Sequence, residues 1–273
     1  MGIFERLAEL ENAGRAVVLA TVIHTQGSVP RREGSKMLIF PEGSTEGTIG
    51  GGEMESQVIS EALAALEGNQ VKTLHYDFRD PSEGDVGVCG GEMDVYIEPL
   101  PARSKVIVVG AGHVGRSIAH LASWLGFQVH AVDDRSGFAT QDSIPDAGKH
   151  HHCAIEDIPT RIPIDENTYI ILTTRNAEID IQGLPALLAT PAAYIGVIGS
   201  RRRWETTAKA LKDSGIQSEQ IERVVSPMGL EIQAETPEEI AVSIMAQIIM
   251  RQRGGSGESM AHVVMEKASK EGD

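Results

Sequence analysis

The first hundred residues combine helical and strand patterns of hydrophobic positions. Apolar side chains recur at helical spacing near the start of the chain and again after three consecutive glycines. Short apolar runs between and after these segments predict strands. The expected helices are 3–12 and 53–68, the second with Gly68 at its C-terminus, and the expected strands are 15–24, 35–40, 71–76 and 93–98. This order predicts a small α+β domain.

The rest of the chain alternates short β-rich apolar runs with helical segments. The expected strands are 105–110, 127–134, 168–174, 192–199 and 222–226. A helix is expected at 113–126, and a last one follows Thr236, which forms a capping box with Glu239 and has Pro237 at the first helical position. Alternation of this kind predicts a parallel sheet covered by helices on both faces.

A stretch with two prolines, Glu98 to Lys105, separates the two patterns and predicts an extended linker. We therefore expect three parts: an α+β domain at 1–100, a Rossmann-like domain at 104–252, and a flexible Gly/Ser-rich tail at 253–273. The predicted fold class is α/β, with a C-terminal Rossmann-like parallel-sheet domain preceded by a smaller α+β domain.

Charge and composition narrow the range of partners. The 273-residue chain has a formal net charge of −15, which argues against nucleic acid and anionic membranes as partners. Its apolar runs are short and its start has no apolar signal region, so we expect a cytoplasmic protein. Cys89 and Cys153 fall in different predicted domains, which argues against a disulfide framework. A homodimer is the default expectation, because two-fold assemblies are the commonest.

A glycine-rich turn joins the first strand and helix of the second half. Gly110 permits the tight turn, Gly112 lets the backbone approach a phosphate, and Gly115 lets helix and strand pack closely. The helix N-terminus offers free N–H groups to an anion. Asp133 ends the next strand, where a carboxylate can hold a ribose diol. His113 is a proton-transfer candidate or a packing residue, and the turn itself could serve packing alone.

A second anion site is predicted where the strand 192–199 meets a helix. Gly199 makes the turn and Ser200 is a suitable N-cap. Three consecutive arginines follow in the first helical turn, where the helix dipole disfavours cations. A bound phosphate would relieve this conflict, with Arg201 and Arg202 as candidate ligands. The alternative is a solvated basic face.

Two glycine-rich stretches in the N-terminal half have the composition of ligand loops. Glycine allows left-handed backbone and close approach of a ligand, although structural turns would look the same. The candidate residues in these stretches are Arg31, Lys36, Gly50, Gly51, Gly52 and Glu53.

Cys89 is flanked by glycines, so it is either an inert buried residue or an accessible thiol able to ligate a soft metal. The run from His150 to Cys153 does not predict a metal site, because four adjacent residues in an extended segment cannot converge on one ion.

The order of several long motifs resembles the XdhC/CoxI family. These motifs are "GSVPR…G.KM", "GTIGGG.ME", "CGG…VYIEPL", "VVGAGHVGR…VDDR", "YIGVIGSRRR" and "SP.GL…ETPEEIAVSI", from about residue 15 to residue 250. The family comprises accessory proteins for xanthine dehydrogenase and related molybdenum hydroxylases.

The resemblance implies a specific function. Family members bind the molybdenum cofactor (molybdopterin), protect it, support its sulfuration with sulfur from a partner cysteine desulfurase, and deliver it to a molybdenum hydroxylase of the xanthine dehydrogenase type. The resemblance also favours Cys89 as a ligand of the cofactor's molybdenum. In "TTRNAEID", Arg175 and Asp180 match the family, but Ala177 stands where many relatives carry a histidine.

Two alternatives remain open at the level of sequence. The glycine turn with Asp133 would also suit an NAD(P)-dependent oxidoreductase, which needs a proton-transfer residue near the nicotinamide. A regulatory module that senses a nucleotide without turnover is the third possibility.

Overall fold

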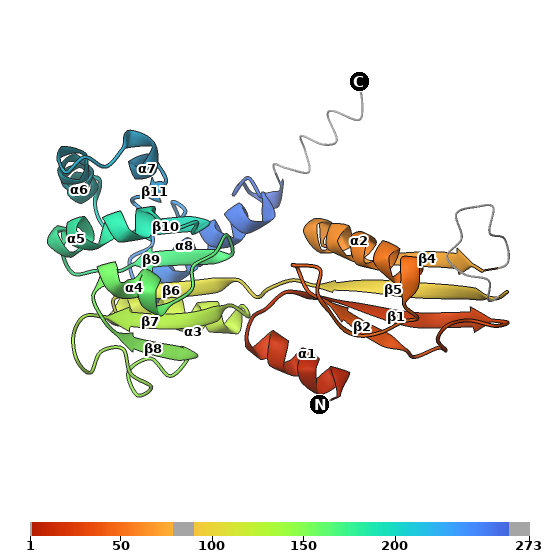
Figure 1. Ribbon diagram of the computed structural model, residues 1–273. Helices are drawn as coiled ribbons and strands as arrows, with labels where there is room; N and C mark the ends of the chain where they lie inside the picture. Colours follow the sequence, from red (N-terminus) through yellow and green to blue (C-terminus); the bar gives the residue numbers. More distant parts are fainter. Residues whose placement is uncertain (1, 79–89, 262–273) are drawn as a thin grey trace, which may run out of the picture. The chain divides into compact units, whose positions relative to one another are not determined.

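The computed structural model describes residues 2–78 and 90–261. The chain divides into two compact units, unit 1 (Met1–Arg103) and unit 2 (Ser104–Asp273). Figure 1 traces both units. None of the described helices combines the length and the apolar character needed to cross a membrane.

Unit 1 is an antiparallel sheet with one helix on each face. Its elements are α1 (Ile3–Asn12), β1 (Val17–Gln26), β2 (Lys36–Ile39), β3 (Thr45–Gly47), α2 (Gly52–Gly68), β4 (Lys72–Asp77) and β5 (Glu92–Leu100). The strand order is β3-β2-β1-β5-β4. Alternate residues of β1 face opposite ways, so Val18 and Ala20 join the core under α2 while Val17 and Leu19 join the core under α1.

One local expectation for unit 1 was wrong. Pro99 and Leu100 belong to β5 rather than to a linker, and they pair with Val18 and Val17 of β1. A proline fits there because the pairing of β4 with β5 begins only at Ile97, so the missing N–H of Pro99 faces no strand. Helix α2 ends at Gly68 as expected, and Asn69 follows it in the left-handed conformation with φ 46°.

Unit 2 is the predicted Rossmann-like domain. Its elements are β6 (Lys105–Val109), α3 (His113–Trp124), β7 (Gln128–Asp133), β8 (Lys149–His152), the short 3₁₀ helix η2 (Ile155–Asp157), α4 (Ile158–Arg161), β9 (Thr168–Leu172), α5 (Ala177–Leu188), β10 (Tyr194–Val197), α6 (Arg201–Asp213), α7 (Ser218–Glu222), β11 (Val224–Val225) and α8 (Pro237–Arg253). The six strands are parallel in the order β11-β10-β9-β6-β7-β8.

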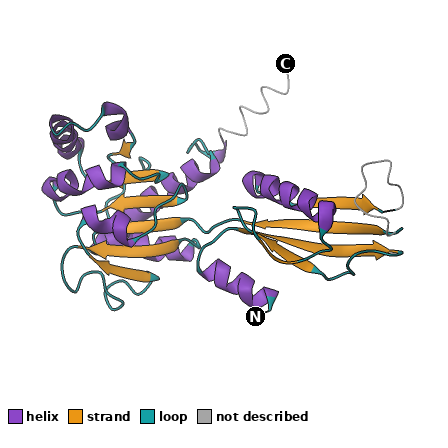
Figure 2. Cartoon of the chain, in the orientation of Figure 1, coloured by secondary structure: helices purple, strands orange, loops and turns teal. Residues whose placement is uncertain are grey.

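The sheet of unit 2 is buried on both faces, as predicted. Val106 and Val108 pack with α3 and α8 on one face, and Ile107 and Val109 pack with η2, α4 and α5 on the other. Figure 2 shows helices on both sides of these strands. The strand order reverses between β6 and β9, which opens a crevice at the carboxyl edge of the sheet.

The capping box predicted for the last helix is confirmed. The Thr236 side chain accepts a hydrogen bond from the backbone N–H of Glu239, and the Glu239 side chain accepts from the N–H of Thr236. Helix α8 ends at Arg253, and Gly254 follows in the left-handed conformation with φ 69°.

Candidate functional site

The glycine turn after β6 is shaped by close packing at two of its three glycines. Gly110 has φ 102°, and a Cβ there would lie 2.6 Å from the carbonyl oxygen of Thr173. A Cβ on Gly115 would lie 1.9 Å from the carbonyl oxygen of Gly110. Gly112 has an ordinary extended backbone, and a Cβ there would meet no atom within 4 Å. The open approach to the turn is therefore at Gly112.

A crevice of about 190 Å³ lies beside this turn, at the carboxyl ends of β6, β7 and β9. It brings together three of the predicted site segments, namely the glycine turn, the end of β7 and the loop after β9. It is lined by Val109, Gly110, Gly112, Asp133, Asp134, Arg135, Cys153, Ile155, Thr173, Thr174, Arg175 and Ile179.

Asp133 is buried, and its carboxylate is fully engaged within the protein. Its Oδ2 accepts from the backbone N–H of Ala111 at 2.8 Å and from Nη2 of Arg135 at 2.8 Å. Its Oδ1 accepts from the backbone N–H and Nε of Arg135, both at 2.9 Å. Burial alone would raise the pKa of Asp133, but these donors outweigh it and hold the pKa below its ordinary value.

Two arginines stand at this crevice, each paired with an aspartate. Arg135 pairs with Asp133, and its guanidinium carbon lies 3.5 Å from the ring centroid of Phe138. Arg175 binds both carboxylate oxygens of Asp134 at 2.7 Å, which lowers the pKa of that carboxyl. Both pairs reach solvent, so the crevice presents cations whose charges are partly balanced.

At the second predicted anion site, the arginine that faces inward is Arg203 and not one of the two predicted ligands. Ser200 caps α6 as predicted, accepting from the backbone N–H of Arg203. Arg201 and Arg202 are exposed, and their side chains have no partner in the described part of the chain. Arg203 instead turns inward across Gly199, where a Cβ would lie 2.8 Å from its Cδ.

Arg203 ties together the loop after β9 and the start of α5. Its guanidinium donates to the carbonyl oxygens of Thr174 and Asn176 and to the carboxylate of Asp180 at 2.5 Å. Asp180 is completely buried and also accepts from the Thr174 hydroxyl. Burial raises the pKa of Asp180 despite these donors. The network fixes the loop that carries Arg175.

The histidines that the structure describes do not gather around a common point. His113 is exposed at the start of α3 with no side-chain partner among the described residues. His130 stacks on His151 across β7 and β8, with Nδ1 and Nε2 3.2 Å apart, and burial lowers the pKa of His130 to about 3. Within residues 2–78 and 90–261, no group of three or more His, Cys, Asp or Glu side chains could hold an ion.

Of the two cysteines, Cys153 lies among the described residues. Cys153 is a free, buried thiol at the edge of the crevice, and burial raises its pKa. Cys89, the predicted molybdenum ligand, lies outside the described residues.

The backbone at the triple glycine of unit 1 is held by the side chain of Glu55, which was not among the predicted ligands. The carboxylate of Glu55 accepts from the Thr48 hydroxyl at 2.8 Å and from the backbone N–H groups of Ile49 and Gly51 at 3.2 and 2.9 Å. These bonds lower the pKa of Glu55 although its burial opposes them. Glu53, the predicted ligand, is exposed, and its side chain makes no ion pair or hydrogen bond within the described residues.

The three glycines of this turn differ in the space around them. All have positive φ, but a Cβ on Gly50 would lie 2.8 Å from Pro30, whereas Gly51 and Gly52 face open space. Gly91, which follows Cys89 and Gly90 in the chain, packs against the same loop, because its Cβ would lie 2.4 Å from the carbonyl oxygen of Ser28. The loop that carries Ser28 and Pro30 therefore contacts both glycine stretches.

The two basic residues predicted as ligands in this stretch, Arg31 and Lys36, have different surroundings. Arg31 is exposed and has no partner in the part of unit 1 that the structure describes. The Lys36 ammonium lies 5.8 Å from the ring centroid of Phe4 in α1.

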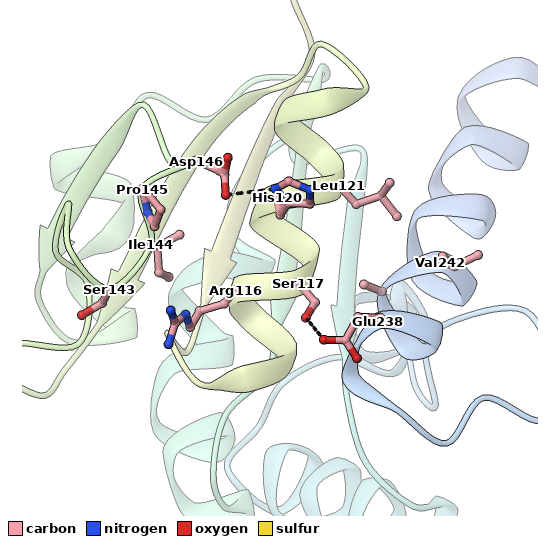
Figure 3. Close-up of a pocket in the computed structure, with 11 residues that line it drawn as sticks. Arg116, Ser117, His120, Leu121, Ser143, Ile144, Pro145, Asp146, Glu238 and Val242 are labelled. Carbon is pink, nitrogen blue, oxygen red and sulfur yellow. Dashed lines mark hydrogen bonds and ion pairs between the residues drawn. The ribbon is translucent and has the colours of Figure 1, made fainter.

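A further hollow, of about 450 Å³, lies on the outer side of α3 and includes none of the predicted site residues. Figure 3 shows His120 directed at Asp146 and Ser117 at Glu238, with nitrogen-to-oxygen and oxygen-to-oxygen distances of 3.1 and 3.4 Å. Arg116 is exposed at its edge.

Comparison with known families gives matches to both halves of the chain. Residues 106–248 match the XdhC Rossmann domain, and residues 10–77 match the XdhC and CoxI family.

Two curated proteins are similar to this chain. The uncharacterized protein YqeB of Escherichia coli (strain K12) is 33% identical over 263 residues, which is 94% of this chain and 47% of that protein. A probable xanthine dehydrogenase subunit of Bacillus subtilis (strain 168) is 28% identical over 183 residues, which is 67% of this chain and 50% of that protein. The chain spans about half the length of these relatives.

A crystal structure of a xanthine dehydrogenase from Bacillus halodurans is similar in fold. Its TM-score is 0.51 at 23% sequence identity, with coverage of 95% of this chain and 98% of that chain. At this identity the likeness concerns the fold alone.

Proposed function

Because this chain belongs to the XdhC and CoxI family, we propose that it is an accessory protein that binds the molybdenum cofactor for a molybdenum hydroxylase of the xanthine dehydrogenase type. The name of the Bacillus subtilis relative, which describes it as part of a probable xanthine dehydrogenase, supports this partner. The relatives are about twice as long, so the proposal concerns the half that this chain represents.

The observation that carries the proposal is the crevice beside the glycine turn. Gly112 leaves open space at the N-terminus of α3, where free backbone N–H groups favour an anion. Arg175 lines the same crevice, and the Arg203 network fixes its loop. These groups fit a phosphate ester such as that of the pterin cofactor. Gly110, Gly115, Gly199 and Ser200 would support this site through backbone geometry.

The proposal includes predicted ligands outside this crevice. Gly51 and Gly52 leave open space that would admit a bulky ligand, while Gly50 is needed for packing. Arg31, Arg201 and Arg202 are exposed and free to reach an anion. Cys89 would contact molybdenum.

The bound cofactor would supply the redox chemistry of the hydroxylase, and this chain would hold and shield it. We also propose that the protein supports sulfuration of the cofactor with sulfur from a cysteine desulfurase, delivers the cofactor to the hydroxylase, and works as a homodimer in the cytoplasm. The sulfuration and delivery steps rest on the family relationship, and the homodimer on two-fold assemblies being the commonest.

The NAD(P)-dependent oxidoreductase alternative is less well supported. The carboxylate expected to hold a ribose, Asp133, is occupied by Arg135 and Ala111. His113, the proton-transfer candidate, is exposed and has no side-chain partner in the described chain to orient it.

Anaerobic equilibrium binding of the isolated molybdenum cofactor tests the proposal, with NAD and NADP measured separately. We expect submicromolar binding of the cofactor, weakened at least about tenfold by Arg175→Ala and by Cys89→Ala. Arg161→Ala, an exposed arginine outside the crevice, is the matched control and should bind as the wild type does. Tight NAD binding with no affinity for the cofactor would overturn the proposal.

A further inference from the structure

Asp133 lies at the end of the second strand of the Rossmann domain, where dinucleotide-binding proteins place the acid that holds the ribose hydroxyls. A carboxylate offers about four lone-pair positions to donors. In this protein the backbone N–H of Ala111 and three N–H groups of Arg135 occupy them at 2.8 to 2.9 Å. The Asp133 side chain is 1% exposed, so a ribose could displace no water from it.

Displacement of Arg135 by a ribose is unfavourable on three counts. The guanidinium binds both carboxylate oxygens, and charge-assisted bidentate bonds are stronger than bonds from neutral hydroxyls. The face of the guanidinium lies 3.5 Å from the ring centroid of Phe138, which adds a cation–π contact. The backbone N–H of Arg135 also binds Oδ1 and would remain there after the side chain had moved.

We propose that Arg135 is a specificity-determining residue that closes Asp133 to ribose, so that the crevice takes phosphate esters which bring no vicinal diol to this position. The inference rests on the proposed function in taking the same crevice as the ligand site. Within that function, it assigns to this chain the molybdenum cofactor without an attached nucleotide, because the ribose of the dinucleotide form carries such a diol.

The test compares 5′-AMP with 2′,3′-dideoxy-5′-AMP as probes of the full chain by isothermal titration calorimetry. The wild-type chain should bind the two with dissociation constants within about twofold, or bind neither measurably. Arg135→Leu opens two positions on Asp133, and should bind AMP at least about tenfold more tightly than the dideoxy analogue. Arg161→Leu is the matched control and should behave as the wild type.

Two results would overturn the inference. One is a wild-type chain that binds AMP tenfold or more tightly than dideoxy-AMP, since the diol would then reach Asp133. The other is an Arg135→Leu chain with no dependence on the diol, whether it binds both probes or neither. If circular dichroism shows that Arg135→Leu does not fold, Arg135→Gln, which keeps one donor, replaces it with the same direction of effect.

This test is independent of cofactor binding. Failure of the wild-type chain to bind the molybdenum cofactor would remove the proposed function, but the diol comparison between the wild type and Arg135→Leu would still decide the role of Arg135.

Discussion

Arg203 and Asp180 form an ion pair with one fully buried partner. The Asp180 side chain has no exposed area and the Arg203 side chain is 21% exposed. The pair spans 23 residues of sequence and links α6 to α5 through the loop after β9. Removal of one partner from such a pair costs far more than the pair itself contributes, because a buried charge is left uncompensated.

Replacement of Arg203 by methionine should lower the free energy of unfolding of unit 2 by about 3–5 kcal/mol. Urea denaturation followed by tryptophan fluorescence measures this, because both tryptophans, Trp124 and Trp204, lie in unit 2. The neighbouring Arg202→Met is the matched control and should change stability by no more than about 0.5 kcal/mol, since Arg202 is exposed. A loss below about 1 kcal/mol in Arg203→Met would contradict the assignment.

His130 should make unit 2 sensitive to acid. Its pKa in the folded protein is about 3, while an unfolded histidine titrates near 6.5, so the unfolded state binds more protons between these values. Stability is therefore lost as the pH falls below about 6.5, by about 2 kcal/mol between pH 7.5 and pH 5. Urea midpoints at the two pH values measure this loss.

In His130→Val the same comparison should show a pH dependence smaller by that amount. His113→Asn, which changes an exposed histidine of the same unit, should keep the wild-type dependence. An undiminished dependence in His130→Val would mean that another group carries it.

The sequence predicted the glycine turn and Asp133 but not the partners that decide what they can bind. Glycine spacing and strand ends are local patterns, and they can be recognised without the fold. Arg135 and Arg203 could not be distinguished from their exposed neighbours in this way. Their orientations depend on Phe138 and Asp180, and on close packing that only the folded chain creates.

At the scale of elements, the glycines of the β6–α3 turn divide into two that are needed for packing and one that a ligand can approach. Gly110 and Gly115 are in contact with the turn's own backbone and with Thr173, while Gly112 borders open space. The same three-glycine pattern therefore contains two structural positions and one position available to a ligand.

This division predicts opposite behaviour for two conservative substitutions. Gly115→Ala places a Cβ 1.9 Å from the Gly110 carbonyl oxygen and should destabilise unit 2 by about 3 kcal/mol or more, measured by urea denaturation. Gly112→Ala should cost only about 0.5–1 kcal/mol, as expected at an N-cap, yet weaken phosphate-ester binding. Equal stability losses in the two variants would contradict this distinction.

The apolar pattern predicted most of the strands and missed two short ones. The strands of unit 2 that are continuous apolar runs, such as Thr168–Leu172, are buried at every position and were expected. β3 and β8 were not expected, because Thr45–Gly47 is exposed throughout and Lys149–His152 is polar. Each is an edge strand of its sheet, and its conformation is determined by pairing with the neighbouring strand and not by a hydrophobic pattern.

At the scale of the whole molecule, the hydrophobic cores among the described residues each belong to a single unit. The two cores of unit 2 run from Val106 to Ile248 and cover both faces of its sheet. The two cores of unit 1 lie between Leu10 and Ile97. A unit with complete cores is expected to fold without the other.

The fragment 104–261 should therefore unfold in a single cooperative thermal transition, followed by far-UV circular dichroism. The full chain is the control, and its unit 2 signal from the two tryptophans should melt within about 5 °C of the fragment. A fragment without a cooperative transition would show that unit 2 depends on unit 1.

The position of β5 in unit 1 has a consequence for synthesis of the chain. β5 is the last strand of its sheet to be made, yet it pairs with β1 on one side and β4 on the other. At about 5–20 residues per second, β1 is translated roughly 4–15 s before β5. During this interval β1 has one unpaired edge and β4 has no neighbour, and such edges recruit other chains. The nascent polypeptide is thus most exposed to misassembly before β5 becomes available to pair with β1 and β4.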